Sequence, residues 1–278
     1  MDSSKFSVPE VLLKESPPST FMKQYYSLPS PIIKYILENA SAINYFKLFQ
    51  TCKILQNFIQ EKYGPQIDVL EAGYFNRNSY FFSIQARNKE IKIRGSSKIY
   101  NELPKNQKIW IRKRLMFHCL PGYVSKRYFK RLNLSTVKEI YLFDTAVKFD
   151  DYKKLLVPSV EILYATVCCS TNGFDIISHT LKSLPNLKVL RLPWHQNLTT
   201  FVELTSIKRD KKLQKAEIYE FIDEFDENNL RGFIVEHMAH GATLYLSFRE
   251  DVPQTVKDKY QDFAEDFNMF SGTKIMIR

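Results

Sequence analysis

Two histidines lie close enough together in the sequence to raise the question of a metal site. His237 and His240 could face the same side of a helix, as paired zinc ligands do. The neighbouring Glu236 precedes the first histidine, whereas a zinc protease needs its general base directly after it. His118 and Cys119 are adjacent, which is a poor spacing for shared coordination. We therefore expect no metal centre and interpret His237 and His240 as a core or surface pair.

Acid–base and nucleophilic catalysis are not indicated either. Six carboxylates crowd the segment between Glu217 and Glu227 without basic neighbours. A general acid and base need surroundings that push two pKa values apart, so we interpret this run as a solvated charged face. There is no Gly-x-Ser-x-Gly nucleophile elbow, and the 8 glycines are scattered singly, which leaves no phosphate-cradling loop. The sequence predicts a protein that is not an enzyme and has no cofactor.

Composition indicates a globular protein inside the cell. The chain has 278 residues, of which 44% are apolar. No run reaches the roughly 18 apolar residues of a spanning helix, and no secretion signal follows Met1. We expect a soluble protein of the cytoplasm or nucleus. The 4 cysteines, none of them in a Cys-x-x-Cys spacing, are interpreted as buried free thiols.

Positive charge is concentrated in one part of the chain. The net charge is +10, and residues 87–131 hold 14 Lys/Arg against Glu90 and Glu102. Residues 108–117 are predicted to form a basic amphipathic helix, with Trp110, Arg114 and Phe117 near one side. Clustered cations with interleaved aromatic residues also allow an alternative function, a nucleic-acid-binding module over residues 105–131. The other interpretation is a solvated face whose aromatic residues belong to the core.

A repeating unit fills the second half of the sequence. Apolar residues occupy its first, fourth and sixth positions, and the unit starts are 23, 27 and 26 residues apart. The four units carry Val137, Ile140 and Leu142; Val160, Leu163 and Ala165; Leu187, Leu190 and Leu192; and Leu213, Ala216 and Ile218. This spacing is typical of one strand and one helix per unit in a leucine-rich-repeat-like stack. Weaker units at 241–246 and 273–277 extend the stack, and 80–86 with 90–94 read as two further strands.

The repeat also predicts which side chains contact a partner. Strand alternation turns the third and fifth residues of each unit away from the core, onto the concave face of the sheet. Tyrosine and arginine dominate binding hot spots because they bury a large area and keep a polar group. The residues predicted to bind a protein substrate are Tyr141, Tyr164, Arg191, Glu217 and Tyr245. The alternative is that these tyrosines only pack over neighbouring strands.

The N-terminal part shows a different pattern. Residues 1–24 hold three prolines without a sustained period and are predicted to be a flexible arm. Helical spacing begins after Leu28 and Pro29 and is expected to end at Gly64 and Pro65, because glycine and proline interrupt helices. This stretch resembles an F-box on the following residues: Leu28, Pro29, Ile32, Ile33, Ile36, Leu37, Leu48, Cys52, Lys53, Phe58 and Ile59. Its layout is also similar to nematode F-box proteins, in which such a box precedes a divergent strand-and-helix region.

The resemblance implies an adaptor. An F-box binds the Skp-type linker of a cullin–RING ubiquitin ligase, and the rest of the chain selects the substrate. By this resemblance Leu28, Pro29, Ile32, Ile33, Ile36, Leu37, Leu48 and Cys52 bind the linker. The alternative for the same residues is a helical hairpin that caps a stand-alone protein-binding repeat scaffold.

The predicted architecture is therefore α+β overall. We expect a flexible arm over 1–24, a small all-α F-box-like module over 25–65, and an α/β leucine-rich-repeat-like domain over 66–278. In that domain a curved parallel sheet carries helices on its outer side. Its expected partners are a Skp-type linker and an unidentified protein substrate.

Overall fold

The computed structural model describes most of the chain from residue 66 onward. The described residues are 66–76, 79–86, 89–95, 109–120, 129–166, 169–170, 175–194, 198–222, 226–270 and 272–278, together with Ile32 and Tyr35. Ile32 and Tyr35 are helical, with 45% and 68% of their surface exposed. The remaining predicted linker-binding residues, Leu28, Pro29, Ile33, Ile36, Leu37, Leu48 and Cys52, lie outside the described residues, as does the predicted arm over 1–24.

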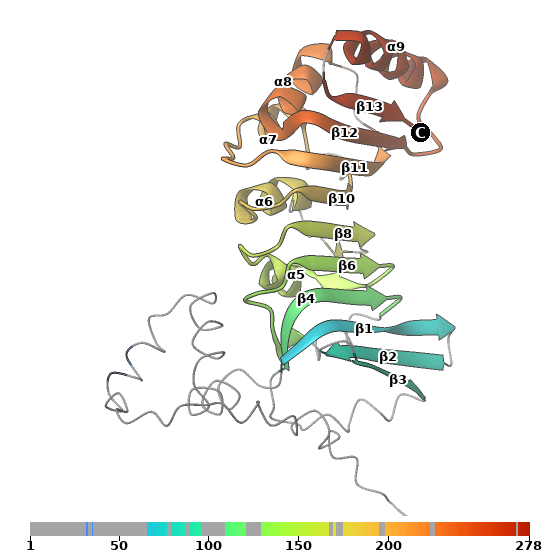
Figure 1. Cartoon of the computed structure of the whole chain (residues 1–278). Coiled ribbons are helices and arrows are strands. Elements are labelled where there is room, and N and C mark those ends of the chain that lie inside the picture. The colour runs from blue at the N-terminus through green and yellow to red at the C-terminus, as the bar shows by residue number, and fades with distance from the viewer. Residues whose placement is uncertain are drawn as a thin grey trace, which may run out of the picture.

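The described part of the chain has an α/β architecture built on one mostly parallel sheet of eleven strands (Figure 1). Its parallel strands follow chain order along the sheet and have these bounds: β4 (Ile109–His118), β6 (Glu139–Phe143), β8 (Ile162–Thr166), β10 (Val189–Pro193), β11 (Leu213–Phe221), β12 (Met238–Phe248) and β13 (Lys274–Ile277). The strands predicted from the repeating unit are thus confirmed, and they lie side by side.

The other end of the sheet is antiparallel. β1 (Gln66–Asn76), β2 (Ser79–Ala86) and β3 (Lys89–Gly95) form a meander, and β1 joins it to the parallel part by pairing with β4. The two strands predicted at 80–86 and 90–94 are confirmed as β2 and β3. Short strands complete the fold: β5 (Leu132–Asn133) pairs with β4, while β7 (Val147–Lys148) and β9 (Cys169–Ser170) form a separate two-stranded sheet.

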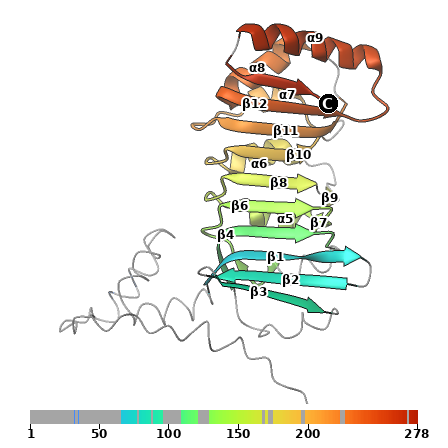
Figure 2. The same ribbon diagram turned by 45° about the vertical axis from the view of Figure 1, so that its right-hand side comes forward.

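Helices cover one face of the large sheet. They are α5 (Phe149–Leu155), α6 (Ile176–Ser183), α7 (Phe201–Thr205) and α8 (Glu227–His237), all behind the strands in Figure 2. A longer helix, α9 (Gln254–Phe270), lies between β12 and β13 in the chain and closes the C-terminal end of the stack, at the top of Figure 1. None of the helices in the described part of the chain combines the length and hydropathy needed to cross a bilayer.

The core consists of apolar rows that run across the strands. The fourth positions of the units pair from strand to strand, and the sixth positions form a second row. Leu115, Ile140, Leu163, Leu190, Ala216 and Leu244 have no exposed surface, and neither do Phe117, Leu142, Ala165, Leu192, Ile218 and Leu246. No single unit could bury these side chains, so each row becomes a core only when the strands are stacked.

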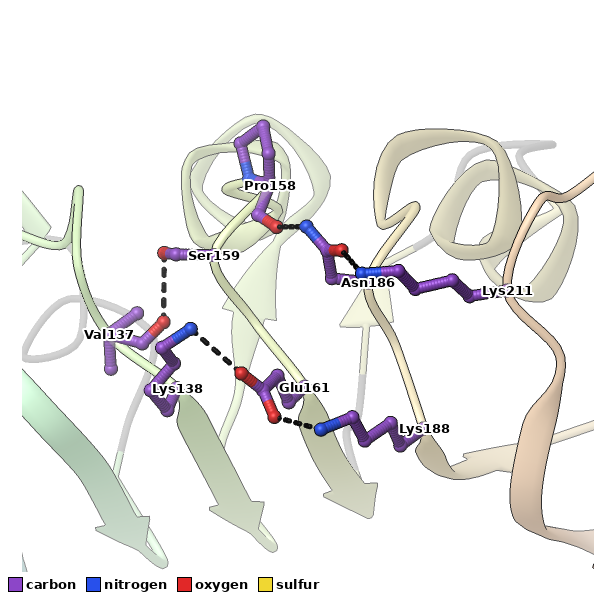
Figure 3. Close-up of polar contacts among 8 residues, drawn as sticks. All are labelled: Val137, Lys138, Pro158, Ser159, Glu161, Asn186, Lys188 and Lys211. Carbon is purple, nitrogen blue, oxygen red and sulfur yellow. Dashed lines mark hydrogen bonds and ion pairs between the residues drawn. The ribbon is translucent and has the colours of Figure 1, made fainter. Parts of the chain in front are cut away.

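The connections between units repeat as well. A tight turn precedes each of three strands, with Val137, Val160 and Leu187 donating their N–H groups to the carbonyl oxygens of Leu134, Val157 and Leu184. Polar side chains then link one turn to the next (Figure 3). Ser159 donates to the carbonyl of Val137 at 2.9 Å, and Asn186 donates to the carbonyl of Pro158 at 2.8 Å. These bonds fix the register of neighbouring units.

The predicted basic helix over 108–117 is wrong, because this segment is the strand β4. Ile109, Trp110 and Ile111 are all buried at its start, and Leu115 and Phe117 then alternate with half-buried residues as strand residues should. Between these two stretches a register shift pairs Ile67 with Ile111 but Val69 with Arg114, which marks a β-bulge at Arg112 and Lys113. The extra residue breaks the two-residue period and produces a false helical spacing. The strand β1 was not predicted at all.

The expectation of buried thiols is wrong for Cys119. This residue follows β4 as an exposed free cysteine, with a φ of 51°. The backbone turns sharply at this position and carries the side chain out of the core. The side chains of the other three cysteines lie outside the described residues.

Candidate functional site: the open face of the sheet

The sheet has one face that carries no helix among the described residues, which we call the open face (Figure 2). All five residues predicted to bind a substrate lie on it in a single row. Tyr141 pairs with Tyr164, Tyr164 with Arg191, Arg191 with Glu217, and Glu217 with Tyr245. The structure therefore brings together residues that are up to 104 positions apart in the sequence.

The row starts with an aromatic cluster. The rings of Tyr141 and Tyr164 stack with centroids 5.3 Å apart and planes 13° apart. Phe143 stacks beside Tyr141 at 6.0 Å, and His118 lies 5.0 Å from Phe143. These rings are half-buried, so they offer a partner an aromatic surface that is held in place by its neighbours.

A charged group holds the first tyrosine in position. Arg114 forms an ion pair with Glu139 and lies 5.4 Å from the centroid of the Tyr141 ring, while the Tyr141 hydroxyl donates to Glu139 at 3.2 Å. The hydrogen bond to Glu139 raises the pKa of Arg114 above its usual range. Burial, together with the Glu139 charge, raises the pKa of the Tyr141 hydroxyl. Tyr141 is therefore a neutral, oriented hydrogen-bonding group at physiological pH.

The row continues into a cationic cluster around a buried carboxylate. Glu217 is 7% exposed, and three cations approach it: Arg191 Nε at 3.6 Å, Lys215 Nζ at 3.8 Å and Arg278 Nη1 at 3.8 Å. The Arg191 Nε atom is buried and has no hydrogen-bond partner. Three positive charges thus share one negative charge.

Two tyrosines support these cations from the sheet. Lys215 and Arg278 lie over the ring of Tyr245 at 4.8 and 4.4 Å, and Arg191 lies 5.8 Å from the Tyr219 centroid. The Tyr219 hydroxyl in turn donates to the carbonyl of Ala165 at 2.9 Å. Cation–π contacts of this kind keep charged groups over the sheet instead of releasing them to solvent.

The interpretation of the acidic run as a solvated face without basic neighbours is wrong for Glu217. Its members separate in the fold, because β11 ends at Phe221 and α8 begins at Glu227. Asp226 is the N-cap of α8, where its carboxylate accepts from the Asn229 N–H at 3.0 Å. The acidic residues that are adjacent in the sequence therefore do not form one acidic surface in the structure.

The histidine pair is divided between two elements. His237 ends α8 and is fully buried, with Nε2 2.7 Å from the Leu204 carbonyl oxygen, and burial lowers its pKa. His240 is exposed on β12. The described residues contain no group of three or more side chains suited to holding a metal ion.

The structure adds residues that the repeating unit did not predict. Phe143 and Tyr219 occupy the seventh position of their units, one alternation step beyond the predicted pair. His118 ends β4 and Arg278 directly follows β13, so both lie outside the four clear units. Extending the alternation by two residues would have found Phe143 and Tyr219. Arg278 carried no such signal in the sequence.

The basic segment offers little to nucleic acid in its described part. Trp110 and Phe117 are 1% and 0% exposed, so neither can stack on a base. Arg112 lies 3.7 Å from Asp68, and Arg114 is paired with Glu139. The other two interleaved aromatic residues, Tyr123 and Tyr128, lie outside the described residues.

Comparison of the chain with family models, with curated proteins and with solved structures found no match.

Proposed function

We propose that this chain is the substrate-recognition subunit of an SCF-type cullin–RING ubiquitin ligase. In this proposal the F-box-like module over 25–65 docks a Skp-type linker, and the leucine-rich-repeat-like domain over 66–278 holds the protein to be modified. The chain performs no chemistry of its own and needs no cofactor. It acts where such ligases act, in the cytoplasm or the nucleus.

The observation that carries the recognition role is the row of five residues on the open face. A stacked sheet presents a broad surface, and here that surface holds oriented tyrosines beside arginine and lysine side chains. Aromatic and arginine side chains of this kind supply most of the free energy at protein interfaces. The alternative that the tyrosines only pack over neighbouring strands leaves their half-exposed rings without a purpose.

The ligase role is supported by the resemblance of the N-terminal stretch to an F-box. Its apolar residues outnumber those that a capping hairpin can bury alone, and a docked linker would cover the surplus. The exposed Ile32 side chain is consistent with such a surface.

A pull-down with a Skp-type linker tests the ligase role. The intact chain is compared with the triple variant Leu28→Ala/Ile32→Ala/Leu37→Ala, and we expect the variant to lose the linker. The matched control is Val202→Ala/Val235→Ala/Met269→Ala, which removes three exposed apolar side chains from helices of the repeat domain. Equal recovery for all three proteins, or no recovery by the intact chain, would leave a stand-alone binding scaffold as the better description.

A further inference from the structure

The open face changes character along its length. Around β6 and β8 it is aromatic, and its arginine is paired: Arg114 forms an ion pair with Glu139, and the Glu71 carboxylate lies 3.0 Å from His118 Nε2. Around β10 to β13 it is cationic, because Arg191, Lys215 and Arg278 share Glu217 as their one ion-pair partner among the described residues. Lys274, paired in register with Thr243, adds a fourth cation to this half and is exposed.

Glu217 cannot satisfy the cations that surround it. One carboxylate balances one unit of charge, which leaves a net charge of about two over these four side chains. None of the three approaches is a close hydrogen-bonded pair, and the Arg191 Nε donor is buried without a partner. An unmade hydrogen bond costs free energy, so the Arg191 guanidinium, whose side chain is 34% exposed, favours an external acceptor.

We propose that the open face binds an acidic segment of a partner protein, with an aromatic or large apolar residue on the Tyr141–Tyr164 stack and two carboxylates at the cationic cluster. Strands in a sheet are about 4.8 Å apart, so the stack and Glu217 are separated by about 12 Å. An extended chain covers about 3.3 Å per residue. The anchor and the acidic pair are therefore about three to four residues apart.

The charge pattern favours an acidic protein segment over a nucleic acid. A polynucleotide carries a negative charge at every residue and needs positive charge along its whole path. Here the aromatic half carries the carboxylates of Glu71 and Glu139, and Glu139 offsets the charge of Arg114. A peptide can place its charge at one end only, as this face requires.

The same pattern favours two carboxylates over a single phosphate. The three cations converge on the point that the Glu217 carboxylate already occupies. An incoming anion must therefore approach from the sides, near Arg191 or near Lys215 and Arg278. Two separate carboxylates reach both sides, whereas one compact phosphate group reaches only one of them.

The test selects phage-displayed random dodecamers on the immobilised intact chain and then measures binding of an enriched, fluorescein-labelled peptide by anisotropy. We expect enriched peptides to carry an aromatic or large apolar residue three to four positions from two acidic residues. The variant Lys215→Glu/Arg278→Glu should lower the affinity about tenfold or more. The matched control Lys257→Glu/Lys259→Glu changes the net charge equally on α9 and should stay within about twofold of the intact chain.

Several outcomes would overturn the proposal. Enrichment of basic or uncharged peptides would do so, as would no enrichment at all or equal losses in the variant and its control. If polyuridylate displaces the peptide as well as unlabelled peptide does, the face binds nucleic acid. If phosphoserine in place of the glutamates raises the affinity tenfold or more, the occupant is a phosphorylated segment. If Lys215→Glu/Arg278→Glu does not fold, Lys215→Gln/Arg278→Gln takes its place in the assay. This neutral variant should weaken peptide binding by a smaller factor.

This inference rests on the proposed function only in taking the open face as the target-binding surface. The peptide assay contains no linker. Loss of the ligase role would therefore leave the peptide result intact, and failure of the peptide assay would leave the linker result intact.

Discussion

Replacing Glu217 by glutamine removes the carboxylate that Arg191, Lys215 and Arg278 share and keeps the shape of the side chain. Arg191, Lys215 and Arg278 would then repel one another without a central negative charge. We expect Glu217→Gln to destabilise the fold and, at the same time, to strengthen binding of an acidic peptide.

The size of the effect follows from distance and exposure. At 3.6 to 3.8 Å, an effective dielectric constant of about 20 makes each pair worth about 4 kcal/mol before desolvation is counted. Burying the carboxylate itself costs several kcal/mol. The side chains of the three cations are 34%, 36% and 56% exposed, so water screens them strongly. A net loss of about 2 kcal/mol in the free energy of unfolding is the expected outcome.

The assay is urea unfolding followed by circular dichroism at low and high salt. The difference between Glu217→Gln and the intact chain should shrink as sodium chloride rises to 1 M, because salt screens exposed charges. Glu250→Gln, an exposed glutamate in the turn after β12, is the matched control and should change stability by less than about 0.5 kcal/mol.

Two results would refute the reasoning. If Glu217→Gln is as stable as the intact chain at low salt, the carboxylate does not hold the cations together. If the loss is the same at every salt concentration, it comes from packing and not from charge.

Further predictions concern the stability of the stack. Asp175→Ala should cost about 2 kcal/mol in urea unfolding, because the Asp175 carboxylate accepts from two N–H groups at the start of α6 and from a threonine hydroxyl. Asp226→Ala removes an acceptor of one N–H group and should cost about 1 kcal/mol or less. Leu163→Ala, in the fully buried row of β8, should cost about 3 kcal/mol by the same measurement. Burial lowers the pKa of His237, so below about pH 6.5 the unfolded chain binds a proton that the folded chain does not. The free energy of unfolding should therefore fall as the pH drops from about 7.5 until it has passed through the lowered pKa of the folded state, by at most about 1.4 kcal/mol per pH unit for this side chain, and less steeply in His237→Gln. Hydrogen bonds from two lysines lower the pKa of Glu161 (Figure 3). The contribution of Glu161 to the free energy of unfolding should therefore be present above about pH 4.3 and disappear as the pH falls through the lowered pKa. Glu161→Gln should not show this loss in acid titrations.

Register was the part of the fold that the sequence could predict. Apolar residues at the first, fourth and sixth positions can be buried together only if the units stack, so Leu163 and Leu190 had to be neighbours. Side-chain alternation then determined which residues faced away from the core. The row of Tyr141, Tyr164 and Arg191 follows from this geometry alone.

Local irregularity was the part that could not be predicted. The bulge at Arg112 and Lys113 adds one residue to β4, and a strand with one extra residue no longer shows a period of two. The strand β1 has the apolar residues Ile67 and Leu70 on its buried side at the same kind of shifted spacing. Both strands lie at the junction between the antiparallel and parallel parts of the sheet, where the repeat has not yet begun.

Charge pairing on the open face could not be predicted either, and the reason is physical. Burial of the core rows depends on residue type alone, whereas an ion pair depends on where two side chains end. Glu217 belongs to an acidic run in the sequence, yet two of its three nearest cations come from distant segments, Arg191 on β10 and Arg278 after β13. Because the strand order places Arg278 two strands from Glu217, the cationic cluster exists only once the stack is complete. A change in the cap formed by α9 and β13 should therefore weaken binding at the open face even though it touches no residue of the aromatic half.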